Sequence, residues 1–100
     1  MFIAMNRFKI SIGSEDSFET MWRDRDSYLT GVRGFKNFYL IRGATYEDHT
    51  LYASHSTWRD RRDFENWTKS ISFRKAHMGA GEHSDIYLEH PQFEGFEVIL

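Results

Sequence analysis

Asn6 is a residue whose chemical type does not fit its position in the sequence. Residues 2–10 alternate as a β-strand does, and Asn6 lies on a face whose other members are apolar, namely Phe2, Ala4, Phe8 and Ile10. A buried amide without a partner costs about 1–3 kcal/mol. Either a neighbouring backbone group bonds to this amide, which is the more common case for a single residue, or the amide points into a ligand cavity as a donor.

Trp67 and His77 are two further candidates, ten positions apart on one predicted helix. Trp67 lies on the apolar stripe of that helix, where a Trp ordinarily belongs to the core. His77 lies near the end of the helix, where a protonated imidazole interacts favourably with the helix dipole. A neutral imidazole at the same place can instead bind a metal or a haem iron. For each residue a structural role and a ligand-binding role are both open.

The remaining side chains show no other catalytic motif. The other four histidines are His49 and His83 in predicted loops, His90 before Pro91, and His55 in a predicted strand. There is no HxH, HExxH or two-His-one-carboxylate pattern, no phosphate-binding glycine loop and no GxSxG sequence. The lack of cysteine excludes disulfides, thiolate catalysis, iron–sulfur clusters and covalent c-type haem attachment.

Two amphipathic helices are predicted from apolar residues that recur every three or four positions. The first covers residues 15–29, with Ser14 as its N-cap. The second begins after Asp60, which can cap it, and continues to Met78, where Gly79 and Gly81 close it.

Strand-like segments surround these helices, at residues 2–10, 35–43, 50–58 and within 93–100. The order of elements predicts an α+β fold of the ferredoxin-like βαββαβ type, with an antiparallel sheet and two helices on one face. The other face of such a sheet is bare, and the first strand carries apolar residues on both sides. We therefore expect two copies to pair into a homodimeric β-barrel.

The composition limits the range of partners. The chain has 13 basic and 15 acidic residues and a formal charge of −2, so no broad positive surface for nucleic acid is expected. Its apolar runs are far shorter than the roughly 20 residues of a membrane helix, and no secretory signal is visible. We expect a cytoplasmic protein without a membrane partner. The 17 aromatic residues can fill a core, line a flat apolar pocket or form a subunit interface.

Taken together, Asn6 in the first strand, Trp67 within FENWTKS and His77 within FRKAH resemble the IsdG/HmuQ-like haem-degrading monooxygenases. That group belongs to the antibiotic-biosynthesis-monooxygenase superfamily of dimeric α+β barrels. The resemblance covers essentially the whole chain, residues 1–100, as one domain of that type. Its specific part is the ordered set of an Asn followed by W-x9-H on one helix, within a βαββαβ chain of this length.

The resemblance implies a role for each of these residues. His77 would be the axial ligand of the haem iron, Asn6 a hydrogen-bond donor on the distal side, and Trp67 the bulky residue that presses on the porphyrin. Haem would be both the substrate and the cofactor that activates O2. In a homodimer with two sites, the ring would be opened to a bilin-type product with release of iron for iron acquisition. If His77 binds the iron, haem binding should weaken in mild acid, because the imidazole must be neutral to bind iron and a free imidazole titrates near ~6.5.

Other details stay open. The chain has no flavin or nicotinamide motif, so the electrons would come from an external donor such as a cellular reductase. Residues 79–95 depart from the family pattern, which leaves the haem-edge contacts, the cleaved meso position and the product type undecided. Three arginines, Arg7, Arg23 and Arg25, could approach the haem propionates, although surface arginines are usually only solvated.

Three alternative functions are also compatible with these residues. A cofactor-independent quinone-forming monooxygenase of the same superfamily, acting on a polycyclic phenol, would use the same cavity without iron at His77. The chain could also be a non-catalytic haem-binding protein or a small dimeric ligand-binding module, since this fold serves many functions.

Overall fold

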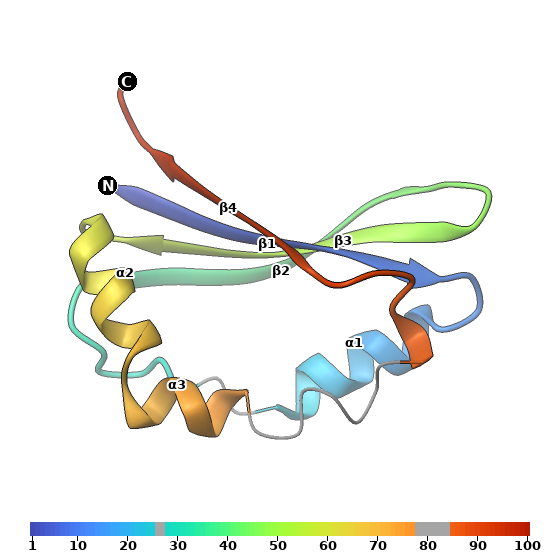
Figure 1. The fold of residues 1–100 in the computed structure, drawn as a ribbon, viewed down its shortest axis with the longest axis horizontal. Helices are drawn as coiled ribbons and strands as arrows, with labels where there is room; N and C mark the ends of the chain where they lie inside the picture. The colour runs from blue at the N-terminus through green and yellow to red at the C-terminus, as the bar shows by residue number, and fades with distance from the viewer. Residues whose placement is uncertain (26–27, 78–84) are drawn as a thin grey trace.

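The computed structural model describes residues 1–25, 28–77 and 85–100. Four antiparallel strands form a sheet in the order β2-β3-β1-β4, and the described helices lie below one face of it (Figure 1). The strands are β1 (Phe2–Ser11), β2 (Phe35–Thr45), β3 (His49–Trp58) and β4 (Gln92–Glu97). The helices are α1 (Glu15–Asp24), α2 (Arg61–Thr68) and α3 (Ile71–Ala76). The predicted ferredoxin-like α+β class, with helices on one face, is confirmed.

The central strand β1 shows why the alternating pattern predicts the sheet correctly. Its residues Phe2, Ala4, Phe8 and Ile10 are all buried under the helices. Each pairs with a β3 residue on the same face, from Phe2 opposite Trp58 to Ile10 opposite Thr50. Because successive side chains of a strand point to opposite faces, this register turns the residues between them toward the open face of the sheet.

The first helix is shorter than the predicted range of 15–29. It ends at Asp24, and Arg25 adopts an extended conformation with φ −84° and ψ 135°. Asp and Ser, the residue types that follow Arg25 in the sequence, have a low helix propensity, so the sequence beyond Asp24 does not favour a longer helix. In its extended conformation Arg25 donates from Nε to the carbonyl of Ala76 at the end of α3, over 2.7 Å. Ser14 does occupy the N-cap position, but its side chain bonds to no backbone N–H of the helix.

The second predicted helix is two helices, which corrects the expectation of one helix up to Met78. Asp60 caps α2 as predicted, accepting a hydrogen bond from the backbone of Asp63. The helix then stops because Ser70 begins a new one: its Oγ accepts from the Phe73 N–H and donates to the Trp67 carbonyl. The predicted end of this segment, from Met78 through Gly79 and Gly81 to His83, lies outside the described residues.

Two apolar clusters fill the space between sheet and helices. One contains Phe8, Ile10, Phe18, Tyr52 and Ile86, under the end of the sheet where α1 packs. The other contains Phe2, Ala4, Leu29 and Trp58, with Phe64 and Trp67 of α2 packed against it. Trp58 is fully buried within this cluster. Asn6 lies along β1 between the members of the two clusters.

None of the helices within the described part of the chain is long and apolar enough to cross a membrane.

Candidate functional site

A cavity of about 930 Å³ lies between the two apolar clusters, with the sheet on one side and the helices on the other. Asn6, Trp67 and His77 all line it. Most of the other lining residues are aromatic or aliphatic, among them Phe8, Leu29, Phe38, Phe64 and Phe93. Its volume is at the upper end of the usual range for ligand pockets. The structure thus brings the three predicted residues, from one strand and two helices, to a single cavity.

Asn6 supplies the sheet side of this cavity. It is partly buried, with Ser54 of β3 as its register partner on one side and Phe93 of β4 on the other. Its amide makes no hydrogen bond with any residue that the structure describes, so the common case of a backbone partner is not found there. The amide is free to bond to a ligand.

His77 lines the helix side of the cavity. Its hydrogen bond to the backbone determines which ring nitrogen can bind a ligand. It stands at the C-cap of α3, where Nδ1 lies 2.8 Å from the carbonyl oxygen of Phe73. A carbonyl only accepts, so Nδ1 carries the proton and the neutral ring leaves the Nε2 lone pair free. The ring also stacks on that of Phe73, with centroids 4.0 Å apart. The side chain is therefore held in one orientation and one tautomer.

The electrostatic surroundings favour the neutral form of His77. Burial lowers the pKa of its imidazole below the usual value, and the charge of Arg25 lowers it further, while the hydrogen bond to Phe73 opposes both effects. A neutral imidazole is the form that binds a metal.

Trp67 stands between His77 and the core. Its ring centroid is 6.0 Å from that of His77, 4.8 Å from Phe73 and 5.6 Å from Trp58. A continuous helix would separate residues 67 and 77 by about 15 Å along its axis. The break at Ser70 is what brings the two rings together. The indole Nε1 of Trp67 is buried and has no hydrogen-bond partner among the described residues.

Arg25 is the one of the three arginines considered above that lines the cavity. Its guanidinium carbon lies 4.5 Å from the centroid of the Trp22 ring, and burial lowers its pKa. Arg7 pairs with Glu94, and its position in the strand turns it toward the open face. Arg23 lines a separate pocket. Arg25 is thus placed to offset a negative charge within the main cavity.

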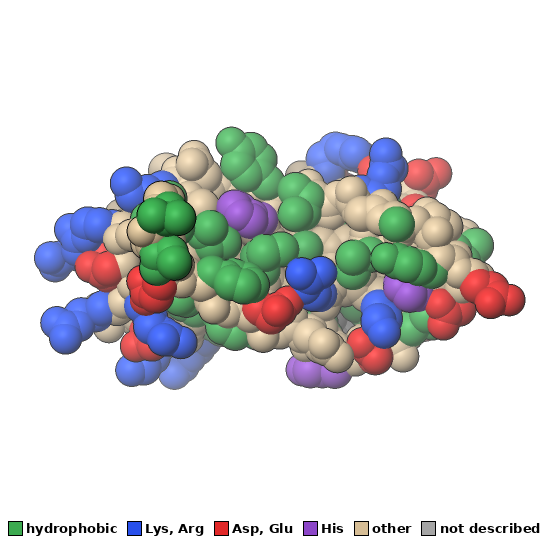
Figure 2. Space-filling view, turned by 90° about the horizontal axis from the view of Figure 1, so that it is seen from above, with side chains coloured by type: hydrophobic (Ala, Val, Ile, Leu, Met, Phe, Trp, Pro, Cys, Tyr) green, Lys and Arg blue, Asp and Glu red, His purple; other side chains and the backbone are tan. Residues whose placement is uncertain are grey.

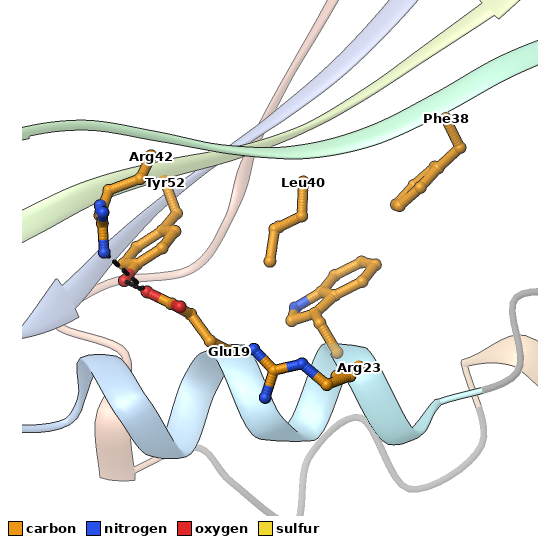
Figure 3. A pocket seen from close by; sticks show the side chains of 7 residues that line it. Glu19, Arg23, Phe38, Leu40, Arg42 and Tyr52 are labelled. Atoms are coloured by element: carbon orange, nitrogen blue, oxygen red, sulfur yellow. Dashed lines mark hydrogen bonds and ion pairs between the residues drawn. The ribbon is translucent and has the colours of Figure 1, made fainter.

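That separate pocket, of about 400 Å³, lies between α1 and the strands β2 and β3. Figure 3 shows Arg42 and Tyr52 converging on Glu19. The phenol of Tyr52 donates to the Glu19 carboxylate, and burial followed by this hydrogen bond raises the pKa of Tyr52 to about 12. Arg42, Tyr52 and Glu19 provide hydrogen-bond partners for one another, so their main effect is to join α1 to the sheet.

The other histidines do not join the site as a group. His49 bonds through Nδ1 to Asp48 over 2.6 Å, and the register of β3 turns His55 toward the open face. His90 does line the cavity, although its side chain is exposed. In the described ranges no three His, Asp or Glu side chains come together as ligands for a metal ion. His83 lies outside those ranges.

The sequence reasoning missed two serines in this cavity, Ser54 and Ser56 of β3. A signal for them exists in the segment 50–58, because both share the alternation of Tyr52 and Trp58, the two large aromatic residues of that strand that are fully buried. Polar residues on a buried strand face indicate either an internal hydrogen bond or a polar lining.

Comparison with known proteins places this geometry in a family. Residues 1–79 match the family model of the antibiotic biosynthesis monooxygenases. Among solved structures, the chain is similar to the heme-degrader MhuD from Mycobacterium tuberculosis with two hemes bound in its active site. The identity is 19%, the TM-score 0.76, and 100% of this chain and 97% of that one are covered. It is also similar to SnoaB, a cofactor-independent oxygenase from Streptomyces nogalater. Here the identity is 17%, the TM-score 0.70, and the coverage 99% of this chain and 93% of that one. The chain belongs to the antibiotic biosynthesis monooxygenase family.

Proposed function

We propose that this protein is a haem-degrading monooxygenase that opens the porphyrin ring to a bilin-type product and releases iron. One observation carries the proposal. The neutral imidazole of His77, whose Nε2 has no hydrogen-bond partner among the described residues, shares a large aromatic cavity with the unpaired amide of Asn6 on the opposite side. The similarity to MhuD, whose structure holds two hemes, supports the same reading.

The residues present fit haem. Haem is a flat apolar plate that carries an iron and two carboxylates, so it needs apolar walls, an axial donor and a cation. The aromatic lining supplies the walls, and apolar burial contributes about 25 cal/mol per Å² before association costs are subtracted. His77 supplies the nitrogen donor, and Arg25 supplies a positive charge within the cavity.

The three residues would act at different places on this substrate. His77 holds the iron through Nε2, while the Phe73 carbonyl fixes its ring and proton. When bound, haem supplies the iron that activates O2 and the meso carbon that is oxidised. Asn6 presents amide hydrogens from the sheet side, where it can orient a small polar ligand. Trp67 would contact the porphyrin, and Trp58, Phe64 and Phe73 would hold it in place because they pack around its ring.

We further propose that two copies form a homodimer and that an external reductase supplies the electrons. The open face of the sheet carries exposed apolar side chains, including Tyr39, Ile41 and Phe96, at 57%, 42% and 42% exposure. Figure 2 looks onto this face and shows hydrophobic side chains along its middle. A second copy of the sheet would remove this surface from water.

The test is to mix the purified protein with haemin and then add ascorbate in air. The haem absorption band should first shift on binding and then disappear as an open-chain tetrapyrrole absorption grows. A band that stays stable after reductant would reduce the proposal to haem binding, and no band shift would overturn it. Mass spectrometry of the product identifies the cleaved position.

Three variants test the roles separately. His77→Ala should lose tight haem binding, whereas Asn6→Ala should bind haem and turn it over slowly, by about 10²-fold for one lost donor. Trp67→Ala should hold a flatter haem and convert it slowly, and full activity in that variant would contradict the distortion role. His90→Ala is the matched control, because His90 lines the same cavity with an exposed side chain.

A cofactor-independent oxygenase acting on a polycyclic phenol is the second candidate function. It is favoured by the comparable similarity to SnoaB and by the unpaired amide of Asn6 in the cavity, which suits a phenol oxygen. That reading predicts no haem band shift and no loss of activity in His77→Ala.

A further inference from the structure

Ser54 lies directly opposite Asn6 in the sheet, and none of the roles proposed so far for Asn6, Trp67 and His77 involves it. The two residues are register partners on β1 and β3, and both line the cavity. Ser54 is only 8% exposed. Its hydroxyl makes no hydrogen bond within the described chain, and neither does the amide of Asn6. Two neighbouring polar side chains thus face an apolar cavity without partners.

The next serine on the same face behaves differently. The Ser56 hydroxyl donates to the Ala4 carbonyl over 3.4 Å and accepts from Nε1 of Trp58 over 2.9 Å. Ser56 therefore has a structural reason to be polar, and Ser54 has none among the residues that the structure describes. The Ser54 hydroxyl is not sealed from the cavity that it lines, so a ligand in the cavity can bond to it.

The register limits what such a ligand can be. Directly opposed residues of an antiparallel pair have Cβ atoms about 4.5–5.5 Å apart. Ser and Asn are short, so their polar atoms can both reach one atom at about 2.7–3.1 Å. Around them on the same face, Ala4, Phe8 and Phe93 are apolar, and the hydroxyl of Ser56 is already bonded within the protein. Two polar side chains this close together can share a ligand as small as one or two non-hydrogen atoms.

We propose that Asn6 and Ser54 together form a binding site for one water-sized polar ligand on the sheet side of the cavity. In the ligand-free protein this ligand is a water that bridges the Ser54 hydroxyl and the Asn6 amide. With haem bound, the same pair donates hydrogen bonds to a small anion held on the side opposite His77, and this second part rests on the proposed function. Ser54 is then a second hydrogen-bonding group for this ligand, beside the Asn6 amide.

The first test needs no haem. Crystal structures of the ligand-free protein and of Ser54→Val should show an ordered water between the two side chains in the former and none in the latter. A parent structure without this water, or with the Ser54 hydroxyl bonded to the protein, would overturn the site. Thermal unfolding of both proteins checks that the variant is folded.

The second test uses fluoride, a small anion that accepts hydrogen bonds, added to the ferric haem complex. Ser54→Ala should bind fluoride about tenfold more weakly, the loss of roughly one hydrogen bond, while Ser54→Thr keeps the hydroxyl and the affinity. Ser56→Ala, changed at the neighbouring serine on the same face, should stay within about twofold of the parent. Haem affinity should be unchanged in all three.

Failure of the proposed Ser54 site and failure of the proposed haem-degrading function would give different results. Equal fluoride affinity in Ser54→Ala and the parent, or an equal loss in Ser56→Ala, overturns the role of Ser54 in the loaded protein. A parent protein that binds no haem overturns the proposed function instead, and the crystallographic water still decides whether the polar site exists.

Discussion

At the scale of the residue, the protonation state of His77 decides whether its ring can act as the proposed iron ligand. Its pKa lies below the usual value, mainly through burial, so the unfolded chain binds this proton more readily than the folded protein does. The neutral ring is thus fully available above about 6.5, the ordinary value for His, and is lost as the pH falls through the lowered pKa. The structure moves the expected loss of haem affinity to a lower pH than that of a free imidazole.

This prediction is checked by titrating the haem absorption band with acid. The parent protein should lose the band with a midpoint below about 6.5. His90→Ala should titrate in the same way, because only the histidine at the end of α3 is proposed to ligate. An unchanged pH profile in His77→Ala would contradict the role of His77 as the ligand.

A second prediction at this scale concerns Tyr52, which joins β3 to Glu19 of α1. Tyr52→Phe removes the phenol but keeps the ion pair of Arg42 and Glu19. A hydrogen bond to a charged group contributes about 1.5–3 kcal/mol, so the free energy of unfolding should fall by about that amount at neutral pH. Urea unfolding measures it.

The pH dependence of the Tyr52 variant supplies the control. The folded pKa of about 12 exceeds the ordinary value of about 10, so the stability from this phenol is present below pH 10 and is lost as the pH rises toward 12. Tyr52→Phe should lack this alkaline loss. A variant that keeps the same alkaline profile as the parent would show that Tyr52 does not cause it.

At the scale of the element, the junction between α2 and α3 positions two of the three site residues. Ser70 caps α3 with its hydroxyl and bonds back to the Trp67 carbonyl. Ser70→Ala should cost about 0.5–2 kcal/mol of stability, as loss of an N-cap does. Because α3 carries Phe73 and His77, haem affinity should fall as well. Thermal unfolding and a haem titration measure the two effects.

Asp60→Ala is the matched control for this junction, since it removes the N-cap of α2 rather than that of α3. It should lower stability by a similar amount and leave the Phe73 to His77 hydrogen bond in place. Equal losses of haem affinity in both variants would mean that general destabilisation, not the position of α3, causes the effect.

At the scale of the whole molecule, the open sheet face predicts assembly. Ile41→Glu places a charge on this face, where the side chain is 42% exposed in one copy. Burying an isoleucine is favourable whereas burying an unpaired charge is costly, so the variant should shift from dimer to monomer. Sedimentation equilibrium measures the mass. Ile71→Glu, at a 70% exposed position of α3, is the control and should not alter it.

The sequence predicted the fold class because its evidence is local and repeated. The period of two in β1 and the spacing of three and four in the helices each recur over several residues, so one irregular position does not erase them. The same patterns identified Asn6 as a polar residue on a buried face and Trp67 as part of an apolar stripe. They failed at Asp24 and at Ser70, where a single hydrogen bond or cap decides whether a helix continues.

The sequence by itself thus determined the order of strands and helices, the face that each side chain occupies, and the chemical types available to a site. The tertiary structure alone decided three further things. The break at Ser70 brought Trp67 and His77 within 6.0 Å of each other. Arg25 lines the cavity, whereas Arg7 and Arg23 do not. The register of β1 and β3 set Ser54 opposite Asn6. The physical reason is common to all three, because each depends on contacts between segments far apart in the chain, and no local period records such contacts.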